Sequence, residues 1–152
     1  MLKRQLVTAL SITAMFIAGT LVAEDAKKAD LSKVKCVVSG KAINPEATAD
    51  YKGGKVYFCC PGCPGAFAKN EKKFATKANH QLAMTGQFVQ TNCPMSGKPA
   101  KADKVVKVAG VDVAFCCGNC TKAAESKKGD EQINLVFNDK AFKNGFEVAK
   151  KK

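Results

Sequence analysis

Two short stretches of the chain show the alternation of apolar and polar positions that predicts β-hairpins. The first, residues 51–58, is interrupted by Gly53-Gly54, where the predicted hairpin turns. The second places the valine-rich residues 105–108 and 111–115 on either side of Ala109-Gly110, which predicts a turn there. Each predicted hairpin runs into a pair of adjacent cysteines.

The pattern changes from strand to helix after the first cysteine cluster. Residues 66–74 have helical spacing, and Phe67 and Phe74 would share one face of this helix if it is continuous. Both rings are then expected to pack in the core. Residues 80–90 form the predicted junction between the two halves of the chain.

After the second cysteine cluster the pattern again changes from strand to helix, and it then predicts further helices. Residues 121–128 predict a short helix that stops near Gly129. Residues 131–137 and 140–148 predict two further helices. Three phenylalanines in these helices would cap the core: Phe137, Phe142 and Phe146.

The two halves of the chain are copies of one another. Residues 36–63 align with residues 93–120 without a gap, and ten of the twenty-eight aligned positions are identical. Two copies are too few for a solenoid. The sequence therefore predicts an α+β protein made of two small cysteine-rich modules, each a β-hairpin followed by a helix, with extra helices at the C-terminus.

All eight cysteines belong to the two copies, and we take all eight as candidate metal ligands: Cys36, Cys59, Cys60 and Cys63 in the first, and Cys93, Cys116, Cys117 and Cys120 in the second. A turn at the first cysteine and a strand-to-helix corner at the others can bring sulfurs to one point, as a tetrahedral thiolate site requires. We expect Cys36, Cys59 and Cys63 to converge. Because successive strand residues face opposite sides, Cys60 is either a fourth ligand or a buried packing residue, and Cys117 poses the same question.

The low content of large apolar residues favours a structural role for these cysteines. The chain has no tryptophan and two tyrosines, and modules of this size commonly need a metal or disulfides to fold. Thiolate ligands prefer Zn(II), Cu(I) or another soft heavy metal, here one ion per module. Met95 could add a thioether, although packing is its expected role. His80, the only histidine, is expected at the surface.

The cysteine spacing resembles that of a known family. The same spacing holds for Cys36–Cys59–Cys63 and for Cys93–Cys116–Cys120. In each set, twenty-two residues separate the first cysteine from the second, and three residues separate the second from the third. Together with Cys-x-x-Ser-Gly and Val-Tyr-Phe-Cys-Cys-Pro-Gly-Cys, this spacing resembles the TRASH and YHS domains. The resemblance implies small treble-clef-like modules, over residues 36–90 and 91–148, that serve in heavy-metal sensing, trafficking or resistance.

The N-terminus has the parts of a secretory signal peptide. Lys3 and Arg4 precede an apolar run that is short for a membrane span, and cleavage is expected after Ala23. Residues 24–35 would form a flexible lead-in. The sequence thus predicts a secreted or periplasmic protein without stable membrane insertion after cleavage.

The formal net charge of +12 changes this interpretation little. The lysines are scattered, with a basic tail at residues 149–152, and no arginine–aromatic interleaving of the kind that reads bases is present. We therefore expect a solvated surface and no nucleic-acid partner. A metal ion is the expected ligand, and a periplasmic partner protein could meet the exposed hairpin edges.

Two alternatives to a metal site remain at this point. In an oxidising compartment the four cysteines of each module could form two disulfides and make a stapled interaction module. The Cys60–Cys63 and Cys117–Cys120 pairs could instead act as thiol–disulfide oxidoreductase motifs. The flanking βαβ pattern of such enzymes is missing, and no other catalytic constellation is present, so the sequence does not predict an enzyme.

Overall fold

The computed structural model describes residues 31–150. The predicted signal peptide and most of the predicted lead-in lie outside the described residues, as do the last two lysines of the basic tail. The elements are η1 (Leu31–Lys33), β1 (Asn44–Tyr51), β2 (Gly54–Phe58), α1 (Gly62–Lys69), α2 (Glu71–Met84), β3 (Phe88–Gln90), β4 (Lys101–Val108), β5 (Val111–Phe115), α3 (Gly118–Glu125), α4 (Gly129–Phe137), α5 (Asp139–Gly145) and β6 (Phe146–Val148).

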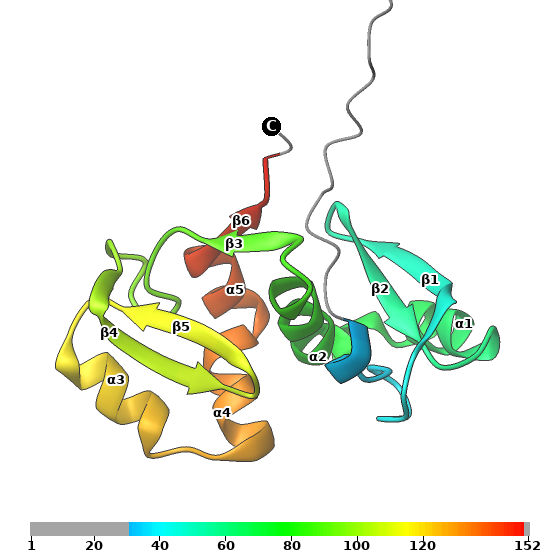
Figure 1. The fold of residues 1–152 in the computed structure, drawn as a ribbon, viewed down its shortest axis with the longest axis horizontal. Coiled ribbons are helices and arrows are strands. Elements are labelled where there is room, and N and C mark those ends of the chain that lie inside the picture. The colour runs from blue at the N-terminus through cyan, green and yellow to red at the C-terminus, as the bar shows by residue number, and fades with distance from the viewer. Residues whose placement is uncertain (1–30, 151–152) are drawn as a thin grey trace, which may run out of the picture.

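The two predicted hairpins are present (Figure 1), and they have the same register. β1 pairs antiparallel with β2, and β4 pairs antiparallel with β5; each pair contains a register shift at the equivalent place. The first hairpin turns at Lys52-Gly53, one residue before the predicted pair, and the second turns at Ala109-Gly110 as predicted. Both turn residues have positive φ in each hairpin, as a type I′ turn requires.

A short helix follows each hairpin, so the α+β architecture of two modules is confirmed. In the first module the helix is not continuous: α1 ends at Lys69, and α2 begins at Glu71 after Asn70 has left the helical conformation with φ −137°. Phe67 and Phe74 nevertheless meet across this break, with ring centroids 6.4 Å apart.

The segment between the modules is more ordered than a simple junction. Residues 80–84 belong to the last turns of α2, and Phe88–Gln90 form β3. The prediction of a helix over residues 140–148 is wrong at its end, because α5 stops at Gly145 and Phe146–Val148 form β6, which pairs with β3. Buried Phe146 stacks on Phe142, with centroids 5.1 Å apart, and this packing holds β6 beside β3.

The helix predicted over residues 121–128 is also placed differently. α3 spans Gly118–Glu125, and Gly129, expected to follow the helix as its stop, is the first residue of α4, with φ +55°. None of the helices within residues 31–150 combines the length and the apolar character that a membrane crossing needs.

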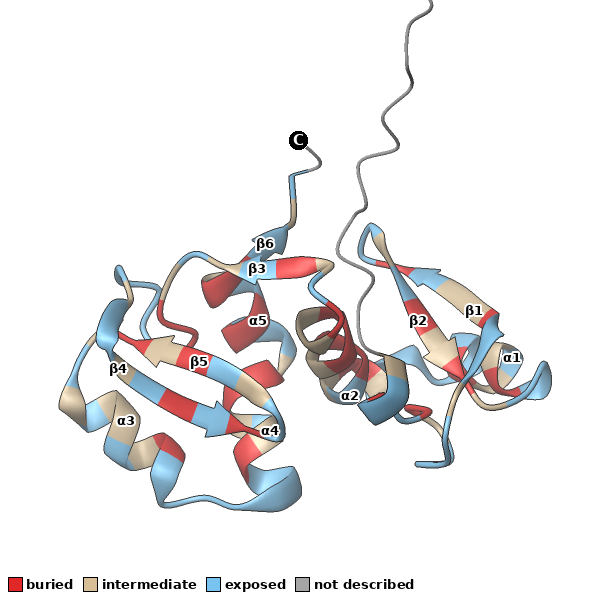
Figure 2. Ribbon diagram, viewed as in Figure 1, coloured by how far each residue is buried: buried red, intermediate tan, exposed pale blue. Residues whose placement is uncertain are grey.

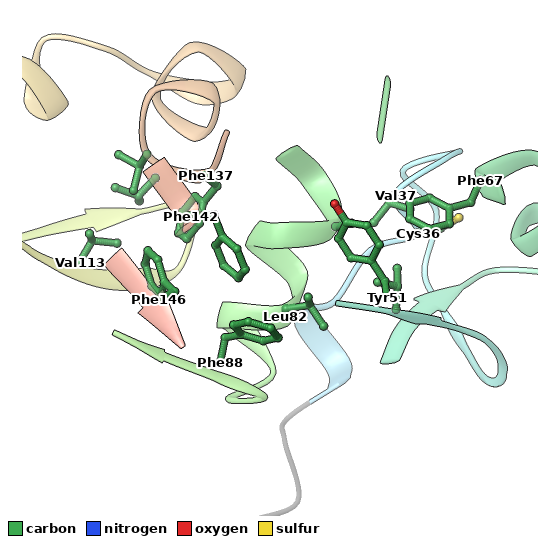
Figure 3. Packing of buried hydrophobic residues seen from close by; sticks show 14 of the residues in the cluster. Cys36, Val37, Tyr51, Phe67, Leu82, Phe88, Val113, Phe137, Phe142 and Phe146 are labelled. Atoms are coloured by element: carbon green, nitrogen blue, oxygen red, sulfur yellow. The ribbon is translucent and has the colours of Figure 1, made fainter. Parts of the chain in front are cut away.

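One apolar core joins the two modules. Figure 1 shows α2 between the two hairpins, and Figure 2 shows the buried face of α2 directed into the molecule. Leu82 of α2 is fully buried and lies between Tyr51 of the first hairpin and Phe88 of β3 (Figure 3). The core continues through Phe137, which is also fully buried. The predicted role of the three C-terminal phenylalanines in closing the core is confirmed.

Candidate metal centres

The first module brings three sulfurs from distant positions to one point. Cys36 lies in the turn before β1, Cys59 follows the last residue of β2, and Cys63 is in the first turn of α1. Their Sγ atoms all lie within 4.8 Å of one another, and the Cys59 and Cys63 sulfurs are 3.6 Å apart. Four sulfurs around zinc at about 2.3 Å stand roughly 3.8 Å from each other, so the spacing suits a thiolate-bound ion.

The turn that presents Cys36 is closed by two backbone hydrogen bonds. The Cys36 amide donates to Lys41 O at 2.8 Å, and the Gly40 amide donates to Cys36 O at 2.8 Å. Gly40 has φ +73°, a conformation that glycine adopts without the strain a side chain would bring. This explains the Cys-x-x-Ser-Gly-Lys spacing: the loop must reverse tightly enough to leave the sulfur pointing inward.

The second module repeats this construction. Cys93, Cys116 and Cys120 form the equivalent cluster, with all three sulfurs within 4.8 Å of one another. The Cys93 amide donates to Lys98 O at 2.8 Å, and Gly97 closes the turn with φ +69°. The structure thus brings together six of the eight predicted ligands, in two groups of three.

The remaining two cysteines lie at the outer side of these clusters. Cys60 and Cys117 are exposed, so neither is the buried packing residue that was one of the two alternatives for this position. The Cys60 Sγ lies 3.3 Å from the Cys63 Sγ, and the Cys117 Sγ lies 3.7 Å from the Cys120 Sγ. Each exposed sulfur therefore touches its cluster from the solvent side.

The first cysteine of each cluster is already biased toward the thiolate form. Burial raises the pKa of Cys36, but hydrogen bonds from the Ser39 hydroxyl and from nearby backbone amides outweigh it and bring the pKa to about 6. The same balance at Cys93 gives a pKa of about 7. A thiolate is the form of cysteine that binds metal, so each turn presents a ready ligand near neutral pH.

The third cysteine of each cluster behaves in the opposite way. Its hydrogen bond with Cys60 is the main reason that the pKa of Cys63 is raised, and burial adds to it. Burial is the main cause at Cys120, whose pKa is raised as well. Negative charge gathered on neighbouring sulfurs resists the next ionisation. A bound cation would relieve this repulsion.

Sequence reasoning did not identify the hydroxyls that support the clusters. The Ser39 Oγ lies 3.1 Å from the Cys59 Sγ, and the Ser96 Oγ lies 3.2 Å from the Cys116 Sγ. Because both serines are identities of the internal repeat, the alignment of the two copies contained the signal. A hydroxyl at this distance can stabilise a metal-bound thiolate and fix its orientation.

Two other candidate residues lie outside the clusters. The Nε2 atom of His80 is 3.1 Å from Ala109 O, and its ring packs edge-on against Phe137 at 5.0 Å. His80 is thus half-buried rather than fully at the surface, and burial lowers its pKa; it takes no part in either sulfur cluster. Met95 is partly buried against the core, in line with the packing role expected for it.

All eight cysteines are free in the structure, with no disulfide between them. Comparison of the chain with protein-family models, with curated proteins and with solved structures gave no match. The donor set and its geometry are therefore the basis for a functional conclusion.

Proposed function

We propose that this chain is an exported metal-binding protein that holds Zn(II) or Cu(I), one ion in each module. The observation that carries the proposal is the convergence of three sulfurs in each copy of the repeat. Sulfur-only clusters select soft or borderline metal ions over Mg²⁺ and Ca²⁺, which prefer oxygen. The resemblance of the cysteine spacing to TRASH and YHS domains supports a role in metal trafficking, sensing or resistance.

The surroundings of the clusters also support metal binding. Each cluster draws its cysteines from a turn, the end of a strand and the start of a helix, so a bound ion would tie three elements together. With few large apolar side chains available, such a tie is a substantial part of the stability of a small module. In the proposal, the metal is both the cargo and the link that completes each module.

Metal analysis of the full chain, purified anaerobically without added metal and without added reductant, tests this function. We expect about one zinc or copper ion per module and cooperative loss of structure when a strong chelator removes it. Thiol counting of the denatured protein should find all eight cysteines reduced. A folded, metal-free protein with four disulfides would refute the proposal and establish the stapled module instead.

A second function, thiol–disulfide exchange, is favoured by one observation. The exposed Cys60 has its pKa lowered, mainly by a hydrogen bond with Cys63, whose own pKa is raised. In such a reaction the Cys60 thiolate would attack a substrate disulfide, and Cys63 would then displace the reduced substrate, leaving a Cys60–Cys63 disulfide. Reduction of a protein disulfide by the metal-free chain, abolished by Cys60→Ser, would establish this activity; absence of turnover would exclude it.

A further inference from the structure

We infer that Cys60 and Cys117 are the solvent-side ligands through which each centre exchanges its metal with other molecules. This inference rests on the proposed metal-binding function and assigns different roles to the four cysteines of a module. The three converging sulfurs retain the ion. The fourth sulfur binds it reversibly and gives way to the thiolate of an acceptor.

Exposure separates the fourth cysteine from the other three. Cys36 and Cys93 are 2% and 0% exposed, and Cys63 is buried as well. Cys59 and Cys116 are half-buried, and each has a serine hydroxyl against its sulfur. Cys120 is half-buried, so among the four cysteines in either module only Cys60 or Cys117 is exposed to an incoming ligand.

The distances place this accessible sulfur within coordination range. In the second module the Cys117 Sγ is 3.7 Å from the Cys116 Sγ and 3.7 Å from the Cys120 Sγ, and these two sulfurs are 3.8 Å apart. The three sulfurs form a nearly equilateral triangle whose sides match the edge of a tetrahedral zinc–sulfur site, about 3.8 Å. Cys93 lies within 4.8 Å of two of its corners and completes the four-sulfur set.

In the first module the exposed sulfur also lies against the third cysteine of its cluster, but at a shorter distance. The Cys60 Sγ approaches the Cys63 Sγ to 3.3 Å, closer than two sulfurs would stand on one tetrahedral ion. A small outward rotation of the exposed side chain corrects this spacing, and such rotations are rapid at the surface. The same accessibility lets the side chain move out of the coordination shell when another ligand arrives.

The exchange step needs no oxidant and no change of metal charge. A thiolate of the acceptor binds the ion while the bond from the ion to the Cys60 Sγ breaks, so one thiolate replaces another. The released Cys60 sulfur takes up a proton from water. The acceptor then displaces the inner sulfurs one after another, as a multidentate chelator does.

Paired serine substitutions in the full chain test this assignment, with Co(II) as a spectroscopic probe and zinc for kinetics. The variant Cys60→Ser/Cys117→Ser removes both exposed thiols, and Cys59→Ser/Cys116→Ser, which removes their immediate neighbours in sequence, is the matched control. Three quantities are measured: metal bound per chain, the thiolate-to-cobalt charge-transfer absorbance per ion, and the rate of zinc transfer to a chromogenic chelator.

For Cys60→Ser/Cys117→Ser we expect two ions to remain bound per chain. The charge-transfer absorbance should be lower by about a quarter, because three thiolates replace four. Zinc transfer should be faster by about tenfold or more, because a weaker complex releases its ion faster. The control variant should lose most of its metal. Unchanged absorbance, a zinc-transfer rate that is unchanged or slower, or metal loss equal to that of the control would overturn the exchange role. If the unsubstituted protein binds neither ion, the proposed function itself fails.

Discussion

The side-chain amide of Gln81 pairs with the backbone of Tyr57 as a neighbouring strand would. Gln81 Oε1 accepts from the Tyr57 amide at 2.7 Å, and Gln81 Nε2 donates to Tyr57 O at 3.0 Å. In the second module, Gln90 makes the same pair of bonds to Ala114, the residue equivalent to Tyr57 in the repeat. Each amide fixes the strand just ahead of its cysteine pair, and thereby helps to set where the sulfurs lie.

Replacing Gln81 by methionine should destabilise the protein by about 1–3 kcal/mol, because the partly buried amide and carbonyl of Tyr57 lose their partners. Gln81 is 3% exposed, so water cannot easily replace it. Gln87 provides a matched control, since it makes the same two bonds to Lys55 at an exposed position. Chemical denaturation should show a much smaller loss for Gln87→Met, and equal losses would contradict this explanation.

A polar cluster between the modules predicts a weak dependence of stability on acid pH. The Lys52 Nζ lies 2.6 Å from Asp139 Oδ1, and the Asn79 amide donates to the same oxygen at 3.0 Å. The hydrogen bond from Lys52 is the main reason that the pKa of Asp139 is lowered. Because the pKa of this carboxyl is lower in the folded protein than in the unfolded chain, ionised Asp139 stabilises the fold at pH values above its pKa in the unfolded chain, about 4. This stabilisation is lost as the pH falls through the pKa of Asp139 in the folded protein.

The effect should be small, about 0.2–1 kcal/mol, because the carboxylate is 59% exposed and therefore screened. The measurement is the free energy of unfolding between pH 3 and 6 for the parent protein and for Asp139→Asn. We expect the difference between the two proteins to shrink below pH 4. Asp103→Asn serves as the control, because Asp103 pairs with its neighbour Lys104 and connects no other elements.

The cysteine clusters could be predicted because their geometry depends on short-range features. The Cys36 turn is closed within six residues, and Cys59 and Cys63 are held by a strand end and one helical turn. The internal repeat doubled the signal, since both copies kept the same spacing. The positions of the hairpins could be predicted from the alternation of apolar and polar residues and from the turn residues, because these are also short-range features.

Features that depend on distant partners could not be predicted from local patterns. Phe146–Val148 continued a helical pattern, but β3 offers them a strand partner far away in the chain. His80 had no local sign of burial, and its contacts with Ala109 and Phe137 come from the packing of the second half against α2. Tertiary contacts of this kind routinely override local preference.

Substitution of one inner cysteine should empty one centre and leave the other loaded. Cys63→Ser removes a ligand that contributes only to the first cluster, and Cys120→Ser does the same in the second. Native mass spectrometry should show the metal content falling from two ions to one in each variant and to none in the double variant. Complete metal loss from either single variant would mean that the two centres do not bind independently.

Gly145 connects the C-terminal helix to the second centre. Gly145 O accepts hydrogen bonds from the amides of Thr91 and Asn92, at 2.8 and 3.2 Å, immediately before Cys93. A Cβ at Gly145 would lie 2.9 Å from the Pro94 Cα and 3.0 Å from Asn92 O, and backbone atoms cannot move aside as a flexible side chain can.

We therefore expect Gly145→Ala to destabilise the protein by about 1–3 kcal/mol and to displace the turn that carries Cys93. The zinc affinity of the second centre should fall, while that of the first should stay unchanged, as measured by titration in Cys63→Ser and Cys120→Ser backgrounds. Gly65→Ala is the control, because a Cβ there meets no atom within 4 Å and alanine favours the helix. The clash acts directly on the segment that bears Cys93. If the zinc affinity of the second centre is nevertheless the same with and without Gly145→Ala, α5 stabilises the fold without positioning Cys93.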